Sequence, residues 1–143
     1  MDIVFQIIMC VLGTLGFAVT MKAPVKSLKY IALGGFISAF IERSLAMHTN
    51  DFIACLAAMT ILSLYCEAAS RIIKTPVTVT LMPSTIPLLP GSSIYYTMLY
   101  AIEGNYELII KYGKATLFAG LGIALGAVIS SAAVKMILSL KKN

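Results

Sequence analysis

The chain has 143 residues, of which 59% are hydrophobic and only 12% are charged, about half the charged share of ordinary soluble domains. So few charges cannot cover a water-exposed surface, which excludes an ordinary soluble globular protein. The net charge of +5 comes from bases spread over short segments rather than gathered in a stripe, so a nucleic-acid-binding protein is not indicated either.

Long apolar runs instead predict an all-α integral membrane protein with a single transmembrane domain over residues 1–143. A bilayer core about 30 Å thick needs roughly 20 helical residues, and long charged side chains are tolerated near the ends of a span. About five transmembrane helices are expected, the fourth broken, at residues 3–21, 28–46, 51–73, 75–103 and 114–138. The first run is predicted to be a retained helix rather than a signal peptide, because it opens with Asp2 and no basic segment.

The basic residues predict how the chain is oriented in the cell membrane. With five spans and the N-terminus outside, the inner segments hold Lys22, Lys26, Lys29, Arg71, Lys74, Lys135, Lys141 and Lys142. The outer segments hold only Arg43, Lys111 and Lys114. The positive-inside rule therefore favours an outer N-terminus and a cytoplasmic C-terminus. The alternative has four spans, with the fourth run as a re-entrant loop.

Motifs for catalysis, nucleotide binding or metal binding are not found, and the loops are too short for another domain. We therefore expect no enzyme activity, no cofactor and no metal site. Cys10, Cys55 and Cys66 are odd in number and lack metal or redox spacing, which favours buried packing roles. The single His48 is expected to be solvated in a loop, with a pH-sensitive role as the alternative.

Small residues recur at three- and four-residue steps in the last span, where Gly122 and Gly126 form a GxxxG motif. Small side chains let helices approach closely in lipid. The motif predicts either packing between helices of this chain or docking of a second subunit.

The segment from Lys74 to Met98 carries four of the five prolines and has no charge after Lys74. The four are Pro76, Pro83, Pro87 and Pro90. An interior proline removes a helical hydrogen bond, so a regular helix cannot continue through all of them. Irregular backbone at membrane depth is tolerated only where protein buries it or where it lines a wet cavity. The alternative is a kinked helix repaired by its own hydroxyl groups.

This broken segment is the predicted solute site, formed by Pro83, Ser84, Thr85, Pro87, Pro90, Gly91, Ser92 and Ser93. Ser92 or Ser93 could be the N-cap of a helix whose amides face a carboxylate. Carbonyls freed by the upstream prolines could bind an ammonium group, which suits a neutral amino acid better than a dicarboxylate. Gly91 is expected to be needed for its backbone freedom and for close approach of the solute.

Glu42 and Glu67 are two of the acidic residues within the predicted spans. Glu67 and Arg71 are four residues apart and can form an ion pair that marks the membrane boundary. If Glu67 instead faces a cavity, it is the candidate for proton coupling. Glu42 and Arg43 are adjacent and point in different directions, so a partner from another helix is expected.

The sequence TPVTVTLMPSTIPLLPG, followed by SSIYYTM, resembles the signature of the threonine/serine exporter (ThrE) family. The match is to the C-terminal half of the fused exporters, or to the small subunit where the halves are separate chains, and it extends over nearly the whole chain. The resemblance implies proton-driven export of threonine and serine, with a dicarboxylate such as succinate as substrate in some two-subunit systems. It also implies a larger partner subunit in the same lipid bilayer.

Two classes of function follow from these observations. In the first, the chain is half of an exporter whose polar path runs beside the broken span. In the second, it is a non-transporting membrane scaffold for a partner. Hydroxyl groups that line a cavity between residues 83 and 93 would favour the first, and hydroxyl groups bonded to local backbone would favour the second.

Overall fold

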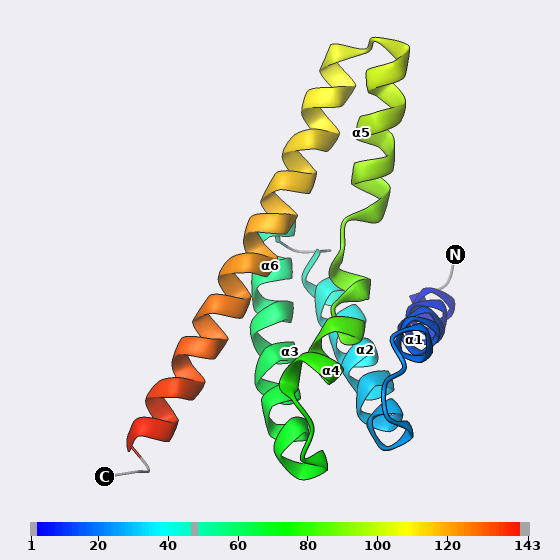
Figure 1. The fold of residues 1–143 in the computed structure, drawn as a ribbon. Coiled ribbons are helices and arrows are strands. Elements are labelled where there is room, and N and C mark those ends of the chain that lie inside the picture. The colour runs from blue at the N-terminus through cyan, green and yellow to red at the C-terminus, as the bar shows by residue number, and fades with distance from the viewer. Residues whose placement is uncertain (1–2, 47–48, 141–143) are drawn as a thin grey trace.

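The computed structural model describes residues 3–46 and 49–140, and every element in these ranges is a helix (Figure 1). The helices are α1 (Ile3–Thr20), α2 (Val25–Ala46), α3 (Asp51–Ile73), α4 (Val77–Ser84), the 3-10 helix η1 (Ile86–Leu88), α5 (Gly91–Glu103) and α6 (Tyr106–Leu140). The predicted all-α class is confirmed over this part of the chain. Asp2, His48, Lys141 and Lys142 lie outside the described residues.

Two of the described helices are long and apolar enough to cross a membrane, namely α3 and the Tyr106–Met136 stretch of α6. Phe5–Thr20 and Val77–Leu88 form shorter apolar helices. By contrast, α2 is long but carries charges near both ends, among them Lys26 and Glu42. The count of five spans therefore stays a prediction.

Adjacent glycines in α2 bring three helices together. A Cβ atom added at Gly34 would lie 2.5 Å from the Oγ of Ser84 in α4, and one added at Gly35 would lie 2.7 Å from the Oγ1 of Thr14 in α1. Both distances are shorter than a van der Waals contact, so only glycine fits without a shift. The two residues thus let α4 and α1 pack closely on different faces of α2.

The GxxxG motif of α6 packs on α3. A Cβ atom at Gly122 would lie 2.6 Å from the backbone oxygen of Phe52, and one at Gly126 would lie 2.8 Å from that of Leu56. The two helices therefore run parallel with their backbones in close approach, as small side chains permit. Packing within the chain is the correct alternative for this motif. The prediction that these two glycines dock a second subunit is wrong, because α3 already covers them.

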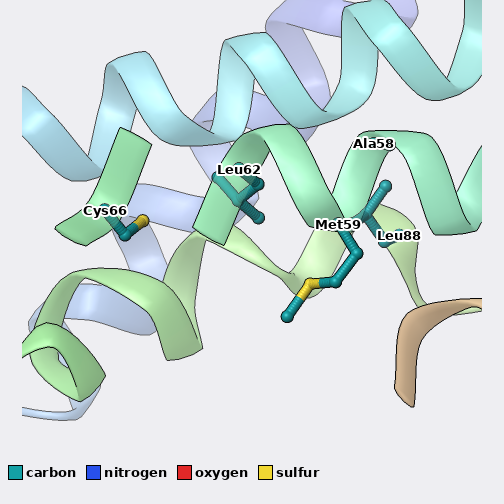
Figure 2. Close-up of a cluster of buried hydrophobic side chains, with 5 residues drawn as sticks. All are labelled: Ala58, Met59, Leu62, Cys66 and Leu88. Carbon is teal, nitrogen blue, oxygen red and sulfur yellow. The ribbon is translucent and has the colours of Figure 1, made fainter. Parts of the chain in front are cut away.

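The core lies where α3 meets the broken segment. Its buried side chains are Ala58, Met59, Leu62 and Cys66 of α3 with Leu88 of η1 (Figure 2). Cys55 is also buried and Cys10 is half-buried, and all three cysteines are free thiols. Packing roles are thus confirmed for the two cysteines of α3.

The fourth run is broken as predicted, into α4, η1 and α5. Pro83 lies in the last turn of α4. The helix does not continue, because Pro87 lacks the N–H that would bond to the carbonyl of Pro83 four residues earlier. The segment between the helices turns at Thr85 and again at Pro90 before α5 begins. The break is thus a real interruption of the helix rather than a simple kink.

Beyond the break, α5 leaves the other helices and forms an antiparallel hairpin with the first part of α6 (Figure 1). Gly104 ends α5 in the left-handed region at φ 74°, where glycine is favoured. The rings of Tyr96 and Tyr100 lie 5.2 and 5.6 Å from that of Tyr112 in α6. With 35 residues, α6 is about 52 Å long, so it extends well past the predicted 114–138 span and past a bilayer core of about 30 Å.

Candidate solute cavity

A partly open cavity of about 600 Å³ lies where α2 ends and α3 begins. Its walls come from α1, the end of α2, the start of α3, the Pro87–Pro90 segment, the start of α5 and α6. The polar side chains in the lining are those of Gln6, Glu42, Arg43, Asp51, Ser92 and Ser93. The cavity therefore joins the second part of the broken segment to charged residues of other helices.

The start of α5 forms one side of this cavity. Pro87, Pro90, Ser92 and Ser93 all belong to the lining. Pro90 stands at the N-cap position and no side-chain bond caps the helix. The first amides of α5 therefore lack a side-chain acceptor, and a helix start of this kind attracts anions.

Three details differ from the predicted role of this helix start. Ser92 and Ser93 lie in the first turn and are not the N-cap, because the helix begins one residue after Pro90. Gly91 does not have a positive φ. A Cβ atom built on it meets nothing within 4 Å, so neither backbone conformation nor crowding within the chain requires glycine there.

The first part of the predicted site lies elsewhere. Ser84 is fully buried, its Oγ donates to the backbone oxygen of Ile31 at 3.3 Å, and its own backbone oxygen accepts from Ser38 at 2.9 Å. Thr85 donates to the backbone oxygen of Leu81 at 2.8 Å. Pro83 is buried in α4. None of the three residues from Pro83 to Thr85 lines the cavity. Here both hydroxyl groups bond to backbone, and the hydroxyl group of Ser84 holds α4 on α2.

Four charged or amide side chains of the lining were not part of the predicted site. Glu42 and Arg43 are half-buried and come from the last turns of α2, while Asp51 is exposed at the start of α3. Arg43 Nη2 donates a hydrogen bond to Gln6 Oε1 of α1. The expected partner from another helix is thus present for Arg43, and it is a neutral amide. An unpaired charge inside an apolar span was the sequence signal that could have pointed to this cavity.

Glu67 lies apart from the cavity lining. Its Oε1 pairs with Arg71 Nη2 at 2.9 Å, and the two side chains are 26% and 51% exposed. The predicted ion pair within α3 is confirmed. Neither residue lines the cavity, and both lie near the C-terminal end of α3 whereas the cavity touches its start. Within the described ranges, no group of three His, Cys, Asp or Glu side chains is placed to hold a metal ion.

A family model described as "Threonine/Serine exporter, ThrE" matches residues 6–133, which is most of the chain. No curated protein and no solved structure matches.

Proposed function

The chain belongs to the threonine/serine exporter family, and from this premise we propose that it is one subunit of a transporter that exports threonine and serine with a larger partner subunit. The family places it in the membrane, in agreement with two helices that are apolar enough to span. Transport driven by the proton gradient is part of the proposal.

The observation that carries the proposal is the cavity beside the interrupted helix. Many transporters bind solute where a spanning helix is broken, because the start of the second half offers free amides and the positive end of the helix dipole. Here Ser92 and Ser93 at the start of α5 line the same cavity as Arg43. An amino-acid carboxylate placed there would meet both kinds of donor.

The larger subunit is supported by the exposed apolar side chains of α5. This helix has no buried residue, and Ile94, Tyr95, Met98 and Ile102 are between 44% and 86% exposed. A hairpin that packs mainly on itself leaves such a surface for lipid or for a partner. In this proposal the partner closes the open side of the cavity.

The scaffold function remains the second candidate, and Ser84 and Thr85 favour it. Their hydroxyl groups bond to backbone oxygens, which is the pattern expected of a purely structural segment. Ser92 and Ser93 in the cavity lining favour transport. The first half of the broken segment thus fits a structural role, whereas the cavity beside its second half supports the proposal of transport.

The test is efflux of labelled threonine, serine and succinate from cells that express this chain, the larger subunit, or both. Threonine and serine efflux should require both chains. The double variant Ser92→Ala with Ser93→Ala should lower it while expression and association persist, and Ser131→Ala, an exposed serine of α6, is the matched control. Full efflux from the larger subunit alone would support the scaffold function, and efflux of succinate alone would support the dicarboxylate alternative.

A further inference from the structure

Glu42 and Arg43 carry opposite charges on consecutive positions of α2 and both line the cavity. Side chains at consecutive helical positions do not face each other, so the two are poorly placed to neutralise one another. Among the described residues, neither forms an ion pair within 4.0 Å. Charges inside a membrane protein are costly unless something compensates them, so this pair is placed to bind charges that a solute brings.

Arg43 is held in position without losing its charge. Its guanidinium donates to the amide oxygen of Gln6, and this partner is neutral. A guanidinium group presents several N–H donors in one plane, so some of these donors remain available to a second acceptor. A carboxylate, whose two oxygens lie in one plane, is the acceptor that best matches these N–H donors.

We propose that Arg43 binds the carboxylate of the solute and that Glu42 binds its ammonium group, an assignment that rests on the proposed function. The amides at the start of α5 add donors for the carboxylate. Asp51, exposed at the edge of the cavity, adds a second negative charge toward the ammonium group. The site thus recognises the zwitterion of an α-amino acid by formal charges, whereas the sequence alone suggested uncharged backbone groups.

This arrangement also sets the selectivity. The cavity lining holds two acids and one base. A dicarboxylate would bring its second negative charge against Glu42 or Asp51, and such like-charge contacts reject a ligand. The site therefore disfavours dicarboxylates, hydroxy acids that lack the ammonium group, and amides that lack the carboxylate.

The test uses the complex of this chain with its larger subunit in proteoliposomes and measures exchange of labelled L-serine. The competitors are unlabelled serine, glycerate, which carries a hydroxyl group in place of the ammonium group, and serinamide, which lacks the carboxylate. Glycerate and serinamide should each compete at least about tenfold more weakly than serine, since each leaves a charged group without its partner. Glu42→Gln should reduce the difference in competition between serine and glycerate. Arg43→Gln should reduce the difference in competition between serine and serinamide.

Matched controls make the same chemical changes outside the cavity. Glu103→Gln in the hairpin and Arg71→Gln near the end of α3 lie outside the lining and should leave both competition ratios unchanged. If glycerate and serinamide compete as well as serine in the unaltered complex, the charge assignment is overturned whether or not the variants assemble. The same holds if assembled Glu42→Gln and Arg43→Gln complexes keep the original ratios. A complex that exchanges neither serine nor threonine overturns the proposed function itself.

Discussion

Glu42 and Glu67 are acidic residues on neighbouring helices, and their surroundings differ. Glu42 lines the cavity, whereas Glu67 pairs with Arg71 at the exposed end of α3. An exposed pair of this spacing contributes only about 0.3–0.5 kcal/mol. A charge in that setting marks the end of a span more readily than it couples protons to transport.

We predict that Glu67→Gln leaves the pH-driven rate of serine efflux within about twofold of the unaltered complex. The reason is that the substitution removes only an ion pair with an exposed partner, and Glu67 does not line the cavity. The measurement is initial efflux at two imposed pH gradients. An efflux that no longer responds to the gradient would assign proton coupling to Glu67 after all.

Some residues of the candidate site could be predicted from the sequence, and others could not. Pro87, Pro90, Ser92 and Ser93, which the proline spacing singled out because prolines act on their own helix, line a cavity, and their binding of a solute stays a prediction. Ser84 was misplaced because its bonds reach Ile31 of another helix. Glu42 and Arg43 were noticed but not placed, since which charges share a cavity depends on how α1, α2 and α3 pack. Local rules cannot supply such contacts.

At the scale of elements, the parallel packing of α3 on α6 depends on two glycines. Added Cβ atoms at Gly122 and Gly126 would lie within 2.8 Å of backbone oxygens of α3, and backbone cannot move aside as a flexible side chain can. The GxxxG spacing was visible in the sequence. Its partner was not, because the same small-residue face fits any helix with a complementary surface.

We predict that Gly122→Ala or Gly126→Ala destabilises the protein by about 1–3 kcal/mol, the usual cost of an overpacked contact. Thermal unfolding of the purified complex in detergent measures the effect. Gly120→Ala is the matched control, because its Cβ would meet nothing within 4 Å, and it should not lower the unfolding temperature. Equal behaviour of the three variants would contradict close packing of α3 on α6.

The broken run shows the limit of prediction for elements. Its interruption follows from Pro83 and Pro87, which local chemistry makes poor helix formers. The direction of α5 after the break does not follow, since it is set by the Gly104 turn and by the tyrosines that join α5 to α6. The early start of α6 at Tyr106 was also missed, because Lys111 and Lys114 suggested a membrane boundary although charged residues do not end a helix.

At the scale of the whole molecule, helix directions place most of the described basic residues at one end. Contacts of Gln6 with Arg43 and of Tyr65 with Tyr30 make α1 and α3 antiparallel to α2, and α6 runs parallel to α3. The C-terminal ends of α1, α3 and α6 therefore lie at the same end of the bundle. The described bases near these ends are Lys22, Lys26, Lys29, Arg71, Lys74 and Lys135. The cavity, at the start of α3, lies toward the opposite end.

We predict that the basic end is cytoplasmic and that the cavity and the α5–α6 turn face outward, because bases accumulate on the inner side of membrane proteins. Single cysteines test this in a background where Cys10, Cys55 and Cys66 are replaced by serine. Tyr106→Cys, at a position 78% exposed beside the turn, should react with an impermeant reagent in intact cells. Ser139→Cys, near the end of α6, should react only after the cells are permeabilised. Its reaction in permeabilised cells is the control that shows this cysteine to be reactive. Labelling of Ser139→Cys in intact cells, with protection of Tyr106→Cys, would reverse the orientation and turn the cavity toward the cytoplasm.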